Sequence, residues 1–428
     1  GRVHHKVHLA REQGGGAGSL SLSAANGALS LKGTLNGRAP GKDGAGQLQM
    51  DAQSLGDMGE LAALLASSFD PNNKQSQLSL RQRQGDINIA SGASFQAGAI
   101  DVTADQGAIN LAGKLLTEAG SVGLWAKGDI NLAASSSLSA QRINLSSQAG
   151  AVSAEGGSQL IKGTGLGQLT LTAGEQGLLK SRIYSNTEGW NLNAELWLQE
   201  EVADGKVTLA QLEAMNAKAE TFLAAHPDLF TALTPGQTSV GGISLHAELY
   251  SSGDIEVAEK LDLSNWRLGK TPVPAAGEEP GLEGEAPLDA SAEALAESGV
   301  EANRPEAGDE PVPAPSNQAN PGRAGRLTLR AGGDIHLDQS ISDGFVADTS
   351  AWGSQFVTVE GTPLDALMSE DSSHINLISG ADLTSSNTLN TLAKQGDAGS
   401  LHLADGVTLR TGTGDITVAT QGNLDMAD

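Results

Sequence analysis

Three histidines near the N-terminus form the first pattern that could bind a metal. His4, His5 and His8 give an H-H-x-x-H string, and a metal site needs imidazoles that converge on one face together with further ligands. In an extended strand neighbouring side chains point to opposite faces, so His4 and His5 would diverge. The string is therefore expected to be a solvated edge, and neither a metal nor a cofactor is predicted.

Three further histidines lie inside segments in which apolar and polar residues alternate. His246, His336 and His402 each have an apolar residue on both sides. Alternation with a period of two places the apolar neighbours on the buried face of a strand and the histidine on the other face. We expect these three imidazoles to be isolated groups on the surface.

Carboxylates recur at one place in a short phrase, directly after glycine. These residues are Asp86, Asp129, Asp254, Asp334 and Asp415. Recurrence at a turn favours a structural role, because aspartate bonds readily to the backbone of its own turn. A carbohydrate-active enzyme on a β-helix would instead gather its acids once, beside other reactive groups. The sequence contains no G-x-S-x-G, H-E-x-x-H or G-G-x-G-x-D motif, so we predict no catalytic residue and no enzyme.

The composition argues against a large globular core. The chain of 428 residues holds 55 glycines, 3% aromatic residues and no cysteine, which excludes disulfides and thiolate metal sites. Its net charge of −25 disfavours nucleic acid or an anionic membrane surface as a partner. No apolar run approaches the roughly 18 residues of a membrane-spanning helix, so membrane insertion is not expected.

The elements that hold these side chains repeat with a fixed period. Three apolar columns advance together by 21 or 22 residues: Ile87, Ile109, Ile130 and Val152; Phe95, Leu116, Leu138 and Leu160; and Ile100, Val122 and Ile143. A period near 20 residues indicates a solenoid whose units bury their apolar faces only by stacking. The leucine-rich repeat, the rival solenoid, is not favoured because its L-x-x-L-x-L-x-x-N pattern is absent.

Strand alternation within this period predicts an all-β fold, a right-handed parallel β-helix of about 21–22 residues per coil. Asn88, Asn110 and Asn131 form an outward column whose amides should bond from coil to coil. Strand-like phrases continue over nearly the whole chain.

Three segments interrupt the strand pattern. Residues 57–69 and 208–233 have the caps and apolar stripes of helices, expected to pack on their own scaffold. Residues 271–324 hold nine of the 14 prolines and eleven acidic residues, so they should be disordered. We therefore divide the chain into a β-helix over 1–270, a disordered loop or an inter-domain linker over 271–324, and a β-helix continuation over 325–428.

The later strand phrases resemble a known family. GRLTLRAGGDIHLDQSISDGF (325–345), LISGADLTSSNTL (377–389) and VTLRTGTGDITVATQGNLDMAD (407–428) are similar to the large filamentous-haemagglutinin-like exoproteins, as are GSLSLSAANGALSLKGTLNG (18–37), LRQRQGDINIASG (80–92) and LDLSNWRLG (261–269). The resemblance covers most of the chain except the acidic segment.

This resemblance implies a long right-handed β-helix exported by two-partner secretion through an outer-membrane transporter. Such proteins are extracellular or lie at the bacterial cell surface. They act in biofilm formation and in adhesion to host or bacterial receptors and glycans, or form the stalk of a contact-dependent growth-inhibition toxin. The N-terminus GRVHHKVHLAREQGGG lacks an initiator methionine and an apolar leader segment. The pattern also runs to the last residue, so we expect an internal segment of a longer protein. A carbohydrate-active parallel β-helix enzyme is the alternative from another functional class.

Overall fold

The structure is a computed structural model. It describes residues 17–38, 45–118, 120–162, 167–178, 182–183, 190–226, 243–269, 322–347, 365–367, 371–392 and 398–427. Residues 1–268 and 323–428 form one compact unit. The histidine string at positions 4–8, the expected helical turn at 227–233 and nearly all of the acidic segment lie outside the described residues.

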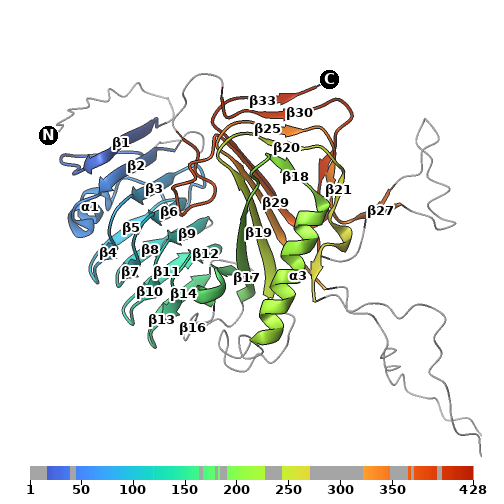
Figure 1. Ribbon diagram of the computed structural model, residues 1–428. Coiled ribbons are helices and arrows are strands. Elements are labelled where there is room, and N and C mark those ends of the chain that lie inside the picture. The colour runs from blue at the N-terminus through green and yellow to red at the C-terminus, as the bar shows by residue number, and fades with distance from the viewer. Residues whose placement is uncertain are drawn as a thin grey trace, which may run out of the picture. The chain divides into compact units, whose positions relative to one another are not determined.

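One long parallel sheet runs through the described part of the compact unit (Figure 1). Its strands, in spatial order, are β1 (Ser19–Ala28), β2 (Gln47–Ser54), β3 (Gln77–Gln82), β6 (Ala99–Ala104), β9 (Ser121–Ala126), β12 (Arg142–Ser147), β15 (Gly167–Ala173), β17 (Trp190–Glu201), β19 (Ile243–Ser251), β24 (Arg326–Ala331), β29 (His374–Ser379) and β32 (Ile416–Thr420). We call it the long sheet. Its strands rotate along the series, so that β17 and β19 run nearly upright in Figure 1.

Shorter parallel sheets hold the remaining strands of each repeat. Two of them accompany the first half: β4 (Ile87–Ile89), β7 (Ile109–Leu111), β10 (Ile130–Leu132), β13 (Val152–Ala154) and β16 (Arg182–Ile183); and β5 (Ser94–Gln96), β8 (Lys114–Leu116), β11 (Ser137–Ala140) and β14 (Gln159–Lys162). Two accompany the second half: β18 (Lys206–Val207), β20 (Ile255–Val257), β25 (Ile335–Leu337), β30 (Leu401–Leu403) and β33 (Leu424–Met426); and β21 (Leu261–Asp262), β26 (Ile341–Ser342) and β31 (Leu409–Arg410).

Two described pairs are antiparallel and lie outside these stacks. They are β22 (Arg267–Leu268) with β23 (Arg323–Ala324), and β27 (Phe345–Ala347) with β28 (Asp365–Leu367). The first pair brings together the two chain segments that flank the acidic segment. The fold is therefore all-β and dominated by parallel sheets.

The register confirms two of the three predicted apolar columns and corrects the third. Ile87, Ile109, Ile130 and Val152 pair in series, and so do Ile100, Val122 and Ile143. In the third column Phe95 and Leu138 both pair with Leu115, not with Leu116 as predicted. The turn before Leu115, residues 112–113, is two residues shorter than the equivalent turns at 90–93 and 133–136, which places the column position at Leu115, one residue before the predicted Leu116. A shift of one residue exchanges the two faces of a strand.

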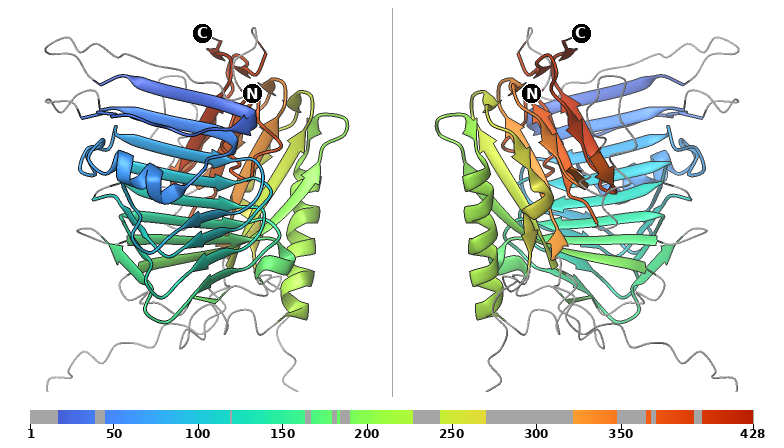
Figure 2. Two further views of the ribbon diagram at one scale, coloured as in Figure 1. Left: turned by 90° about the vertical axis from the view of Figure 1, so that its left-hand side faces the viewer. Right: turned by 90° about the vertical axis from the view of Figure 1, so that its right-hand side faces the viewer.

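Helices lie where the caps and apolar stripes predict them. In α1 (Met58–Leu65) the Asp57 side chain accepts a hydrogen bond from the backbone N–H of Glu60. In α3 (Leu209–Ala225) Thr208 and Gln211 form a capping box, and Leu212, Met215 and Ala219 are buried. The helix packs beside β17, β19 and β22, as the long green helix in both views of Figure 2. The short elements α2 (Glu175–Leu178) and η2 (Leu263–Asn265) complete the described helices.

None of the helices in the described ranges has the length and apolar character needed to cross a lipid bilayer.

Candidate functional site

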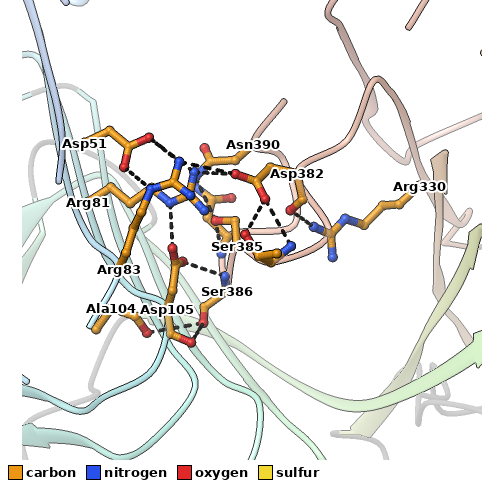
Figure 3. A network of polar contacts seen from close by, with 12 residues as sticks. Asp51, Arg81, Arg83, Ala104, Asp105, Arg330, Asp382, Ser385, Ser386 and Asn390 are labelled. Carbon is orange, nitrogen blue, oxygen red and sulfur yellow. Dashed lines mark hydrogen bonds and ion pairs between the residues drawn. The ribbon is translucent and has the colours of Figure 1, made fainter. Parts of the chain in front are cut away.

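The outer face of the long sheet, which points away from the shorter sheets, buries an extensive charged network. A solenoid would be expected to expose this face, yet Glu195, Glu248 and Arg330 are each at most 2% exposed. Residues 380–392, which we call the clasp segment, lie against this face. They contact both early and late strands of the long sheet (Figures 1 and 3).

At the early strands, Arg81 on β3 is the centre of the network (Figure 3). Its Nε donates to Asp105 at 2.7 Å and its Nη1 donates to Asp382 of the clasp segment at 2.6 Å. Arg83 makes a two-pronged bond to Asp51 on β2, with both N···O distances 2.7 Å. The backbone N–H of Ser386 then donates to Asp105 at 3.0 Å. The clasp segment is thus held by side chains from adjacent strands.

At the late strands, Arg330 on β24 continues the network. Its Nη2 donates to the carbonyl oxygen of Asp382 at 2.8 Å, and its Nη1 donates to Glu248 at 2.7 Å. The Nε1 of Trp197 donates to the same Glu248 carboxylate at 2.9 Å. Asp382 therefore links β3 to β24 through its side chain and its backbone.

A second cluster lies on the same outer face around Glu195 of β17. Arg326 donates from Nε and Nη2 to Glu195, each at 3.1 Å. The Nδ1 of His246 lies 3.5 Å from Glu195, and its Nε2 lies 2.9 Å from the Thr328 hydroxyl. The Trp197 ring stacks on His246 with centroids 5.5 Å apart. His246 is only 3% exposed, so the prediction that it is an isolated surface group is wrong.

The ion pairs set the ionisation of these acids. Burial alone would raise the pKa of Glu195, but Arg326 and His246 hold it well below its ordinary value of 4.5. Burial would likewise raise the pKa of Asp382, but hydrogen bonds from Arg81 and Thr384 hold it below 3.8. These two carboxylates are therefore ionised, and each is paired with a fixed arginine side chain, Arg326 for Glu195 and Arg81 for Asp382. Such groups can clamp strands together but are poorly suited to accept a proton from a substrate.

The other two histidines face outward, as predicted, but are not isolated. His336 on β25 pairs in register with His402 on β30, and their rings stack with centroids 4.9 Å apart. Asp334 lies beside them, and the three residues offer ligand atoms within 4.8 Å of one another. His336 and His402 are 66 positions apart in the sequence, although their strands are direct neighbours in the sheet, because insertions lengthen the repeat between them. Extending the strand register across the insertions is the sequence argument that could have predicted these two histidines to be neighbours.

Four of the five recurrent aspartates, all except the largely exposed Asp415, have the predicted structural role, but with a different partner. Asp86 accepts from the backbone N–H of Ala108 at 2.8 Å, and Asp129 accepts from Ala151 at 2.7 Å. Asp254 similarly accepts from the N–H of Asp334 at 2.8 Å. Each carboxylate thus bonds the turn of the next repeat, not its own turn, and ties adjacent repeats together.

A surface cavity of about 230 Å³ lies on the face that carries His336. Its lining residues are Asp204, Gly205, Asp254, Glu256, His336 and Asp338. Lys206, the cation closest in sequence, pairs with Glu256 at 3.8 Å. Carboxylates beside an imidazole can bind a cation or exchange a proton, so this cavity is the candidate site for chemistry.

Comparison with protein-family models, with curated proteins and with solved structures finds no match for this chain.

Proposed function

We propose that this chain is a structural segment of a secreted, surface-exposed filamentous adhesin. It is built as a right-handed parallel β-helix, interrupted by helical insertions and by the acidic segment. It mediates adhesion to host cells or contact between bacterial cells, and it is not an enzyme. Its partners are an outer-membrane transporter of the two-partner type during export and a receptor or glycan at the target surface.

The observation that carries the proposal is the shared register of the parallel strands. From β3 to β15 the chain visits three sheets in turn, and each return stacks the same column positions. Crossover connections between parallel strands of one sheet are nearly always right-handed, which favours a right-handed β-helix. A stack of this kind extends by adding repeats, at about 4.8 Å per strand, and so suits a shaft.

Bonds between outward side chains also support a shaft. The Asn110 amide donates to Asn88 at 2.8 Å, and the Asn131 amide donates to Asn110 at 2.9 Å. The Ser153 hydroxyl extends the series by donating to Asn131 at 2.9 Å. These bonds confirm the predicted ladder, which resists sliding and bending between repeats.

The test is surface display together with attachment. An antibody against the chain should label intact producing cells, and external protease should remove the label. The purified chain should also block attachment of those cells to their target surface. Ile109→Asp, which places a charge in the core, is the matched control and should not block. A chain found only inside intact cells, or one without effect on attachment, would contradict the proposal.

The cavity beside His336 favours one second candidate, a carbohydrate-active enzyme. Such an enzyme needs an acid and a base at opposite sides of a glycosidic bond, and Glu256 with Asp338 are the candidate pair. Incubation with neutral and acidic polysaccharides should then release new chain ends, and Glu256→Gln with Asp338→Asn should abolish the release. If the parent chain releases no ends, this candidate is rejected.

A further inference from the structure

We propose that Asp334, His336 and His402 form a binding site for a divalent transition-metal ion of the zinc type. The three side chains project from the outer face of the sheet that contains β25 and β30. This site lies apart from the buried network of the long sheet. It goes beyond the proposed adhesin function and does not depend on it.

The register of this sheet gathers the ligands. Glu256, His336, His402 and Asp425 occupy successive strands at one position, so they form a column on the outer face. Neighbouring strands are about 4.8 Å apart, which is close enough for one ion to bridge two side chains. Asp334 lies two residues before His336, on the same face, because strand side chains alternate.

The carboxylate of Asp334 is already fixed in place. Its Oδ1 accepts from the backbone N–H groups of Gly399 and Ser400 at 2.7 and 2.8 Å. Its Oδ2 lies 3.8 Å from Nε2 of His402. Two ligands of a tetrahedral zinc ion, each about 2.0–2.1 Å from the metal, lie roughly 3.3 Å apart. A small rotation of the imidazole brings the pair to that spacing.

His402 has the partner that a metal-binding imidazole requires. Its Nδ1 lies 3.2 Å from the Asp425 carboxylate, and its Nε2 faces Asp334. A proton on Nδ1, held by Asp425, leaves the lone pair of Nε2 for the metal. This carboxylate–histidine–metal arrangement orients ligands in many zinc sites. Asp425 is therefore a positioning residue and not a ligand.

His336 completes the set. Neither of its ring nitrogens has a hydrogen-bond partner among the described residues, so a lone pair is available. The adjoining cavity adds Asp204, Asp254, Glu256 and Asp338, whose charges attract a dication. Two imidazoles and one carboxylate favour zinc, nickel or copper over calcium and magnesium, which prefer oxygen ligands alone. The open side of the site leaves room for water or for a ligand from a partner.

The test is Zn²⁺ titration of the full chain by calorimetry. His4, His5 and His8 are first replaced with glutamine, so that the N-terminal string does not contribute a competing site. This parent should bind one Zn²⁺ with a Kd in the micromolar range or tighter, should bind Co²⁺ with visible d–d absorption, and should not bind Mg²⁺.

The two histidine ligands and the positioning residue Asp425 each have a matched variant. His336→Gln and His402→Gln should each weaken Zn²⁺ binding about 100-fold, and Asp425→Asn about 10-fold, as is typical for an outer partner. His226→Gln and His374→Gln, which lie outside the site, should leave the affinity unchanged. The melting temperature in EDTA should be the same for all variants. A weaker Zn²⁺ affinity then reflects the loss of a ligand and not the loss of the fold.

Two results would overturn the proposal. One is the absence of saturable Zn²⁺ binding by the parent. The other is an affinity that stays the same in the His336→Gln/His402→Gln double variant.

Discussion

Removing the Asp382 carboxylate should weaken the attachment of the clasp segment and destabilise the compact unit, although the bonds from Arg330 to the Asp382 carbonyl and from Ser386 to Asp105 remain. Asp382→Ala deletes the 2.6 Å ion pair to Arg81, whose side chain is 6% exposed. Breaking a buried ion pair by removing one partner costs about 3–5 kcal/mol. Arg81 keeps Asp105 at 2.7 Å, which places the expected loss near the lower end of that range.

The variant also removes a local acceptor. Oδ1 of Asp382 accepts from the backbone N–H of Thr384 at 3.0 Å, and one such bond contributes about 1 kcal/mol. The free energy of unfolding should therefore fall by about 3–4 kcal/mol in total. Asp382→Asn keeps an acceptor for Thr384 but loses the charge, so its stability should lie between those of the parent and Asp382→Ala.

Urea unfolding at pH 7 measures this loss as a lower midpoint at unchanged slope. Asp415→Ala is the matched control, because its carboxylate is 70% exposed, and it should change stability by less than about 0.5 kcal/mol. An Asp382→Ala variant as stable as this control would refute the role assigned to the clasp segment.

The pH dependence gives an independent check of the same pair. The folded-state pKa of Asp382 lies below its ordinary value of 3.8. Its contribution is therefore fully present above the unfolded-state value and is lost as pH falls through the lower, folded-state value. The stability difference between parent and Asp382→Ala should be constant near neutral pH and should shrink below about pH 4.

Three further perturbations test other parts of the structure. Ile109→Asp buries an unpaired charge at a position with 0% exposure, and urea unfolding should show a loss of several kcal/mol. Asn110→Ala removes both of its ladder bonds and should cost about 1–2 kcal/mol by the same assay, whereas a neutral result would mean that the ladder adds nothing. Replacing 272–322 with a short turn joins segments already linked by the antiparallel β22–β23 pair, so far-UV circular dichroism should keep its absolute strand signal; a large loss would show that the acidic segment is structural.

The regular first half of the chain was predictable because its signal is local and repeated. Ile87, Ile109 and Ile130 share one period and one alternation, and stacking follows directly from both. The error at Leu116 has a simple cause. The period fixes the average length of a repeat, whereas a single shorter turn decides which of two adjacent leucines faces the core.

The sites were much less predictable, because their members come from distant positions in the sequence. Arg81 and Asp382 are 301 residues apart, and no local pattern distinguishes either from a solvated charge. His336 and His402 also looked solitary, because insertions of unequal length separate their strands. Only the strand register shows that they are neighbours.

The sequence by itself determined the strand alternation, the stacking period, the helix caps and the ladder of asparagines, because each depends on residues one repeat apart or less. The tertiary structure alone decided which outward side chains become buried. The clasp segment covers part of the outer face of the long sheet, where burial turns ordinary surface charges such as Arg81 and Arg330 into fixed ion pairs. Burial of this kind depends on where distant segments pack, which the period of a repeat does not specify.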